Sequence, residues 1–157
     1  RLAFVSKTPG RTQLINVFRM RNDAALIDLP GYGYAQVPEI VRRQWRGLLE
    51  RYLTERENLV GLVLIMDSRR PFTELDRQMV AWFAVSGRPI HCLLTKSDKL
   101  TRQEQAKVLR DTKKVAAEYA CPITVQLFSS LKKTGMDEAE AVIAPWMKIE
   151  PSVAEAT

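Results

Sequence analysis

The sequence predicts an α/β fold in which a mostly parallel sheet, with one antiparallel strand, lies between two layers of helices. Apolar runs of strand length alternate along the chain with amphipathic segments of helix length. The run 62–66 is apolar almost throughout, as expected for a parallel strand that is covered on both faces. Polar residues directly follow several of these runs, and the carboxyl ends of strands are where open α/β sheets bind ligands.

The first third of the chain predicts two strands and a helix. Residues 12–19 and 24–29 have the composition of strands, and the short segment Arg21–Asp23 between them favours an antiparallel hairpin. Residues 38–58 predict a helix, because Pro38 suits a first turn and apolar residues recur at helical spacing. The expected buried stripe of this helix is Val41, Trp45, Leu48, Leu49 and Tyr52.

The remainder alternates between strands and helices. Thr101 and Glu104 have the spacing of a capping box, so a helix is expected to begin at Thr101, with Val108, Val115, Ala116 and Tyr119 as its stripe. A tail is expected after residue 148. The other predicted strands are 62–66, 89–94 and 123–128, and the other predicted helices are 73–86 and 135–148.

Composition limits the classes of protein. A length of 157 residues suits one domain with a real core, and no apolar run reaches the roughly 18 residues of a membrane span. His91 is the single histidine, which argues against a zinc site or a Ser-His-Asp triad. Cys92 and Cys121 follow no metal or redox spacing and are expected to be buried, reduced thiols.

The charge is basic and uneven. The formal net charge is +6, and residues 1–23 hold five basic side chains against one acid, which is +4 of that excess. A surface of this kind suits phosphate, either of a nucleotide or of RNA. A solvated basic face without a partner is the alternative interpretation.

Two short motifs narrow the function. Asp28-Leu29-Pro30-Gly31 follows the apolar run 24–27, and Thr95-Lys96-Ser97-Asp98 follows the run 90–94. An Asp-x-x-Gly followed downstream by an [Asn/Thr]-Lys-x-Asp, both at strand ends, is typical of a guanine-nucleotide site. Guanine offers two adjacent donors, N1–H and the exocyclic amine, and a carboxylate such as that of Asp98 accepts both in parallel. Adenine has no such pair, so an aspartate here selects guanine.

Four segments closely resemble the EngB (YihA/YsxC) family of bacterial GTPases: Ser6–Gln13, Asp28–Ala35, Thr95–Leu100 and Phe128–Gly135. The resemblance runs over residues 1–148, which it implies to be a three-layer P-loop GTPase domain (G domain), with 149–157 as a tail. It further implies GTP hydrolysis as a switch in assembly of the large ribosomal subunit, linked to normal cell division and septation.

The resemblance also implies roles for individual residues. Thr12 would ligate Mg²⁺, Asp28 would hold Mg²⁺ through a water, and the Gly31 amide would sense the γ-phosphate. Lys96 would cover the guanine ring with its stem, and the Ser130 amide would meet the guanine O6. The full expected GTP-binding set is Gly10, Arg11, Thr12, Gln13, Leu14, Asp28, Leu29, Pro30, Gly31, Thr95, Lys96, Ser97, Asp98, Phe128, Ser129 and Ser130.

The sequence departs from the family pattern in two places. None of its seven glycines begins a Gly-x-x-x-x-Gly-Lys-[Ser/Thr] motif, so the phosphate-binding P-loop is missing from residues 1–157. Either the chain is part of a longer protein, which we favour because it begins at Arg1, or it is a degenerate GTPase. Tyr32 stands where many GTPases carry a water-orienting Gln, so no catalytic residue is assigned and intrinsic hydrolysis is expected to be slow.

The expected partners are GTP, GDP, Mg²⁺, ribosomal RNA and the precursor of the large ribosomal subunit, for a monomeric, cytoplasmic protein without a membrane role. Two alternatives stay open. One is a nucleotide-free G-domain scaffold that binds ribosomal RNA, and the other is an unrelated receiver-like or flavodoxin-like domain. The basic residues expected to face RNA are Arg11, Arg19, Arg21, Arg42, Arg43, Arg69, Arg70, Lys132 and Lys133.

Overall fold

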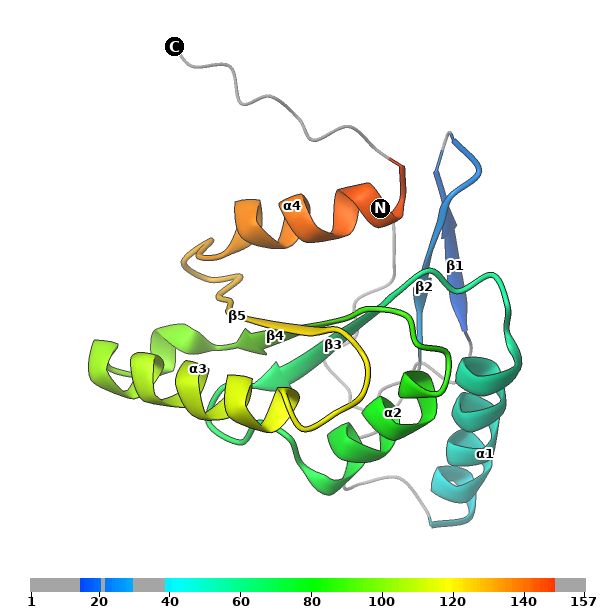
Figure 1. The fold of residues 1–157 in the computed structure, drawn as a ribbon, viewed down its shortest axis with the longest axis horizontal. Helices are drawn as coiled ribbons and strands as arrows, with labels where there is room; N and C mark the ends of the chain where they lie inside the picture. Colours follow the sequence, from blue (N-terminus) through cyan, green and yellow to red (C-terminus); the bar gives the residue numbers. More distant parts are fainter. Residues whose placement is uncertain (1–14, 21, 30–38, 149–157) are drawn as a thin grey trace. The chain divides into compact units, whose positions relative to one another are not determined.

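The computed structural model describes residues 15–20, 22–29 and 39–148, with the side chains of 41 and 42 left out. The chain divides into two compact units, Arg1–Arg56 and Glu57–Thr157, and each is described by itself. Figure 1 labels the helices and strands of both units.

The first unit begins with the expected hairpin. Strands β1 (Asn16–Arg19) and β2 (Ala25–Asp28) pair antiparallel, with Asn16 opposite Asp28. In the turn Asp23 has a φ of 64°, a left-handed conformation that aspartate tolerates better than most residues. The hairpin prediction is therefore confirmed, although β1 is shorter than predicted: Ile15 lies outside the strand, and residues 12–14 lie outside the described residues.

Helix α1 (Glu39–Glu55) follows, and it ends three residues before the predicted end. Leu49 is buried as expected, but Leu48 is 44% exposed, so its place in the predicted stripe is wrong. Consecutive residues of an α-helix point about 100° apart, so Leu48 and Leu49 cannot both face the centre of one buried stripe. Leu53, one turn after Leu49, is buried instead.

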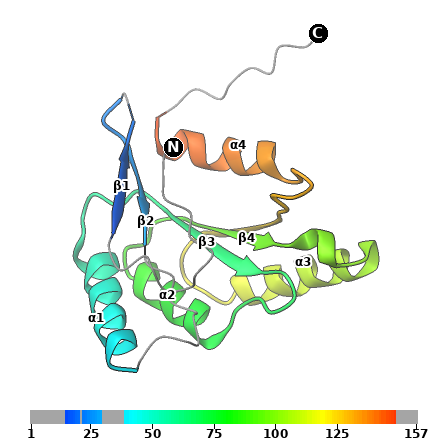
Figure 2. The ribbon, with the colours of Figure 1, turned by 180° about the vertical axis from the view of Figure 1, so that it is seen from behind.

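The second unit is a three-layer α/β arrangement. Its parallel sheet has the order β3-β4-β5, with Leu62 of β3 opposite Ile90 of β4, and Ile90 opposite Ile123 of β5. Figures 1 and 2 show α2 and α3 on one face of this sheet and α4 on the other. The elements are β3 (Leu62–Asp67), α2 (Glu74–Ala84), β4 (Ile90–Thr95), the 3-10 turn η1 (Ser97–Lys99), α3 (Arg102–Ala116), β5 (Ile123–Leu127) and α4 (Met136–Trp146).

The core of this unit lies on the sheet face that carries α2 and α3. Leu64, Cys92 and Val125 are opposite one another on the three strands, and all are buried. Phe83 and Val80 of α2 are fully buried as well. Burial of such side chains contributes roughly 1.5–3 kcal/mol each.

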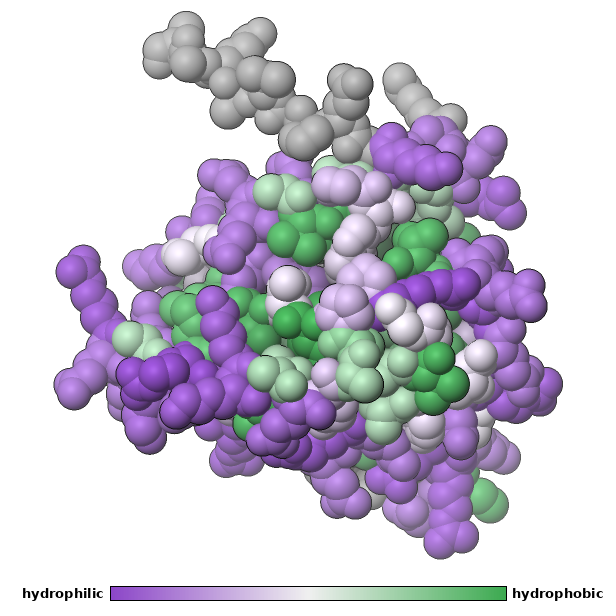
Figure 3. Space-filling model, viewed as in Figure 1, coloured by the Kyte–Doolittle hydropathy of each residue, from purple (hydrophilic) through white to green (hydrophobic). Residues whose placement is uncertain are grey.

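The opposite face of the sheet is only partly covered. Ile65 on the edge strand β3 is 63% exposed, so the expected cover on both faces of the run 62–66 is not met at this residue within the described part of the chain. Further in, the polar residues His91 and Gln126 are fully buried on this face. Figure 3 shows that the surface over α3, on the left of the view, is mostly hydrophilic.

Two capping boxes fix the starts of α2 and α3. Thr101 accepts a hydrogen bond from the Glu104 amide at 3.3 Å, and Glu104 Oε2 accepts one from the Thr101 amide at 2.7 Å, which confirms the prediction. Thr73 and Asp76 form the same reciprocal pair before α2. Each cap stabilises its helix by about 1 kcal/mol.

Both cysteines are free and buried, as expected from the sequence. Burial raises the pKa of the Cys92 thiol to about 12, so this thiol stays protonated and unreactive near neutral pH. Among the residues that the structure describes, no helix combines the length and the apolar character that a membrane span requires.

Candidate functional site

The carboxyl ends of β4 and β5 bring two of the predicted motifs together. The segment Thr95–Asp98 ends β4 and continues into η1, and Phe128–Ser130 follows β5, its parallel neighbour. Ser129 Oγ donates to Asp98 Oδ1 at 2.5 Å. The amide and the hydroxyl of Ser97 donate to the Phe128 carbonyl oxygen at 3.2 and 3.0 Å. The structure therefore joins segments that are about thirty residues apart in sequence.

The surroundings of Asp98 favour its ionised form. The hydrogen bond from Ser129 lowers the pKa of the Asp98 carboxyl, and burial opposes this shift more weakly. Lys99 and Lys132 act in the same direction as Ser129 through their charges. An ionised carboxylate accepts hydrogen bonds only, which suits a ligand edge made of donors.

The loop 129–134 is closed on itself. Ser129 and Thr134 exchange two backbone hydrogen bonds of 3.0 Å, and the Lys132 amide donates to Ser129 Oγ at 3.1 Å. Ser129 Oγ therefore accepts one bond and donates another, so its proton is directed to Asp98. Ser129 is 1% exposed, whereas Ser130 is exposed at the rim of the loop.

A series of hydrogen bonds between buried polar side chains ends at Gly135, directly after this loop. His91 Nε2 lies 2.7 Å from Gln126 Oε1, and Gln126 Nε2 donates to the Gly135 carbonyl oxygen at 2.7 Å. Because the Gln126 oxygen is an acceptor, His91 Nε2 carries a proton, and Nδ1 meets the Thr124 hydroxyl at 2.7 Å. These contacts were not predicted from the sequence; a polar pair at inward positions of neighbouring strands is the signal that could have found them.

The turn after β4 is held in an uncommon conformation. Lys96 has φ 59° and ψ 29°, the left-handed region, which costs a residue other than glycine about 1–2 kcal/mol. The Lys99 amide donates to the Lys96 carbonyl oxygen at 2.9 Å and so closes the turn. Gln105 Nε2 donates to the carbonyl oxygens of Ser97 and Leu100 at 2.8 and 3.1 Å, which ties η1 to α3.

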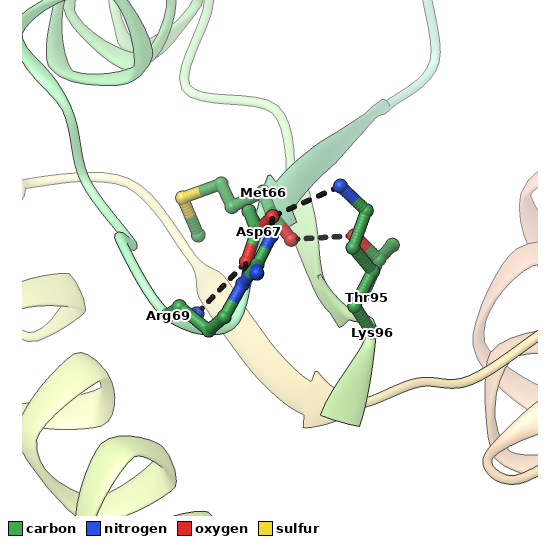
Figure 4. A network of polar contacts seen from close by, with 5 residues as sticks. All are labelled: Met66, Asp67, Arg69, Thr95 and Lys96. Atoms are coloured by element: carbon green, nitrogen blue, oxygen red, sulfur yellow. Dashed lines mark hydrogen bonds and ion pairs between the residues drawn. The ribbon is translucent and has the colours of Figure 1, made fainter. Parts of the chain in front are cut away.

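Asp67, the last residue of β3, contacts this turn directly (Figure 4). Lys96 Nζ donates to Asp67 Oδ2 at 3.0 Å, and Arg69 holds both carboxylate oxygens of Asp67. Beside them, Thr95 Oγ1 donates to the Met66 carbonyl oxygen at 2.9 Å. Asp67 directly follows the predicted strand 62–66, and no role was predicted for it. Arg69 was predicted to face RNA; its side chain is 52% exposed and is paired with Asp67.

Of the predicted phosphate side, only Asp28 and Leu29 are described. Asp28 ends β2 and is exposed, and its Oδ2 accepts from Asn16 Nδ2 at 3.3 Å. A single accessible carboxylate fits Mg²⁺, which takes few protein oxygens and completes its shell with water and phosphate. No group of three or more His, Cys, Asp or Glu side chains suited to a metal occurs within 15–20, 22–29 and 39–148. The predicted residues outside the described ones are Gly10, Arg11, Thr12, Gln13, Leu14, Pro30 and Gly31.

A groove of about 390 Å³ lies elsewhere in the second unit, between the β3–α2 loop and α3. Phe72, Leu100 and Val108 contribute its apolar lining, and Arg69 also lines it. Its lining includes neither Asp98 nor Ser129, so it is distinct from the site at the ends of β4 and β5.

The family model of the 50S ribosome-binding GTPase matches residues 1–96. Two curated relatives are a probable GTP-binding protein EngB from Aromatoleum aromaticum, 65% identical over 94% of this chain and 68% of the relative, and one from Azoarcus sp., 62% identical over 99% of this chain and 74% of the relative.

Solved structures agree on the fold. A crystal structure of a probable GTP-binding protein engB superposes with a TM-score of 0.71 at 18% identity, over 90% of this chain and 84% of that one. Era in complex with MgGDPNP and a fragment of 16S ribosomal RNA superposes with a TM-score of 0.67 at 18% identity, over 99% of this chain and 52% of that one. The fold is that of a GTPase G domain.

Proposed function

Because this chain belongs to the EngB family of GTP-binding proteins, we propose that it acts as a GTP-driven switch in assembly of the large ribosomal subunit, a role linked to normal cell division and septation. Binding and hydrolysis of GTP come with the family. The description of the matching family as a 50S ribosome-binding GTPase supports the ribosomal part of the proposal. The protein would act as a cytoplasmic monomer.

The hydrogen bond between Ser129 and Asp98 is the observation that supports recognition of guanine by Asp98. It holds one carboxylate oxygen in place and keeps the group ionised. Asp98 would accept the N1–H and the exocyclic amine of guanine, two charge-assisted bonds worth roughly 1.5–3 kcal/mol each when shielded from water. Adenine and its nucleotides would gain neither bond, which gives the site its selectivity.

The neighbouring residues would complete the base pocket. The Lys96 stem would lie along the guanine ring, and the Ser130 amide would donate to O6. Thr95, Ser97 and Phe128 would shape the site without reading the base, since Thr95 and Ser97 donate their hydroxyls to carbonyl oxygens of neighbouring segments.

The phosphate side of the proposal rests on the family assignment and on Asp28. Thr12 and Asp28 would hold Mg²⁺, Asp28 through a water, and the ion would neutralise charge on the phosphates. The Gly31 amide would meet the γ-phosphate. The remaining residues proposed for this side are Gly10, Arg11, Gln13, Leu14, Leu29 and Pro30.

Hydrolysis would release the contacts of Thr12 and Gly31 and so reorder their loops, which is the switch. Tyr32 lacks the carboxamide with which a Gln side chain orients the attacking water, so we propose that turnover is slow until a ribosomal particle is bound. Among the residues predicted to face RNA, the exposed side chains of Arg70, Lys132 and Lys133 would contact RNA phosphates.

GTP turnover by the full-length protein is expected to rise at least about tenfold on addition of precursors of the large ribosomal subunit; partners accelerate other GTPases by up to about 10⁵-fold. The measurement is phosphate release under single-turnover conditions, with small-subunit particles as the control. A fast rate that no particle changes would contradict the proposal. Particle binding without nucleotide binding would favour a scaffold function instead.

The RNA-contact part has its own test within the same assay. Lys132→Gln with Lys133→Gln is expected to weaken particle binding and to lower the salt dependence by about one unit of slope per lost phosphate contact. The matched control is Lys113→Gln with Lys114→Gln, an equal change of charge in the last turn of α3. That turn lies at the opposite end of the sheet, because α3 runs back from the carboxyl ends of the strands. Equal losses in both double variants would refute a specific role for Lys132 and Lys133.

A further inference from the structure

The contacts of Asp67 form one connected cluster at the end of β3 (Figure 4). Arg69 donates three hydrogen bonds to it: its amide and Nε reach Oδ1 at 3.0 and 2.9 Å, and its Nη2 reaches Oδ2 at 2.7 Å. Lys96 Nζ donates to Oδ2 at 3.0 Å. The three bonds from Arg69 fix the orientation of the Asp67 carboxylate. The Lys96 ammonium group therefore has a rigid partner.

The backbone around the cluster is equally constrained. Asp67 and Thr95 are opposite each other in the register of β3 and β4, and the Ser68 amide donates to the Thr95 carbonyl oxygen at 2.9 Å. Lys96 then takes its left-handed conformation, closed by the Lys99 amide. Both ends of the Lys96 side chain are therefore positioned: the backbone by the turn and Nζ by Asp67.

A lysine stem has four flexible carbon–carbon torsions, and ordering them costs conformational entropy. A stem anchored at both ends has lost part of this freedom before a ligand binds. We propose that Asp67, supported by Arg69, is a positioning residue that holds the Lys96 stem where it covers the guanine ring. This assignment rests on the proposed nucleotide site.

The burial and the charges fit such a role. The Asp67 side chain is 27% exposed, whereas those of Lys96 and Arg69 are 58% and 52% exposed, so the anion is the protected member of the cluster. The hydrogen bonds from Arg69 hold the pKa of the Asp67 carboxyl well below its usual range, and Asp67 stays ionised at neutral pH. The pair that would read the base, Asp98 and Ser129, shares no hydrogen bond with the cluster.

This separation gives the assignment a distinctive signature. Asp67→Asn keeps the shape of the side chain and removes its charge, so it should weaken binding of every nucleotide whose base stacks on Lys96. It should leave the ratio of GDP to XDP affinity unchanged, because that ratio depends on Asp98. The GDP affinity is expected to fall about threefold to tenfold, mainly through faster dissociation, as for loss of one networked ion pair.

The experiment is a double-mutant cycle with Lys96→Met, which keeps an apolar stem and lacks the ammonium group. Fluorescent GDP dissociation is measured for wild type, each single variant and the pair. Asp67→Asn should have no further effect in the Lys96→Met background. Asp111→Asn is the matched control, an equal change of charge at a carboxylate that pairs with Lys107 on α3, and it should leave dissociation unchanged.

The outcomes separate the two proposals. If wild type binds GDP and Asp67→Asn binds it equally well, the positioning role is refuted and the nucleotide site stands. An Asp67→Asn effect that persists in full in the Lys96→Met background would refute it too, as a general loss of structure. If wild type binds no guanine nucleotide, both proposals fall. Should Asp67→Asn melt early, Arg69→Gln replaces it, since loss of the support should reproduce part of the effect.

Discussion

Asp98→Asn is expected to reverse the base preference of the protein. GDP affinity should fall at least about tenfold, because the neutral amide replaces a charge-assisted acceptor worth roughly 1.5–3 kcal/mol per bond. Affinity for XDP should rise, because xanthine has a carbonyl oxygen at position 2, which repels a carboxylate and accepts a hydrogen bond from the new amide. The side-chain shape and the contact with Ser129 are retained, so the fold should be unaffected.

Competition of GDP and XDP against fluorescent GDP measures this reversal. Asp137→Asn is the matched control, because Asp137 is an exposed carboxylate in the first turn of α4 and the change of charge is identical. An Asp98→Asn variant that binds GDP as tightly as the wild type would show that Asp98 does not read the base.

Gly135→Ala is expected to lower the free energy of unfolding by about 2 kcal/mol or more, which corresponds to roughly 4–8 °C in Tm for a chain of this size. Gly135 has a φ of 78°, and a Cβ placed there would clash with the Leu127 carbonyl oxygen. That oxygen belongs to β5 and cannot move aside. The Cβ would also lie 2.7 Å from Gln126 Nε2, so the polar chain from His91 would be disturbed.

Gly87→Ala is the control that separates the cost of the left-handed backbone from the cost of the steric clash at Gly135. Gly87 has a similar φ of 66°, and a Cβ there meets no atom within 4 Å, so only the backbone strain of about 1–2 kcal/mol remains. The Tm of each variant is measured by thermal unfolding, and the GDP affinity of each is then measured at a temperature where both are folded. Equal melting of the two variants would contradict the tight packing of Gly135 under the loop 129–134.

The parts of the fold that the sequence predicted well are those fixed by local chemistry. Thr101 and Glu104 form the capping box that their spacing predicts, and the predicted strands 89–94 and 123–128 are present as β4 and β5. The neighbourhood of Asp98 and Ser129 followed as well, because carboxyl ends of adjacent parallel strands lie at one edge.

What the sequence could not predict depends on tertiary contacts. Leu48 fits a helical stripe as well as Leu49 does, and only packing decides which is buried. His91 of β4 contacts Gln126 of β5, and Asp67 at the end of β3 contacts Lys96 after β4. Such pairs depend on strand register, which no local pattern of residues specifies.

The most direct test of the central claim is a titration of fluorescent GDP into the full-length protein with Mg²⁺ present and unlabelled ATP as competitor. We predict micromolar or tighter binding that GDP displaces and ATP does not, because the Asp98 carboxylate selects the donor edge of guanine. Equal displacement by ATP, or no binding at all, would contradict a guanine-nucleotide site at the ends of β4 and β5.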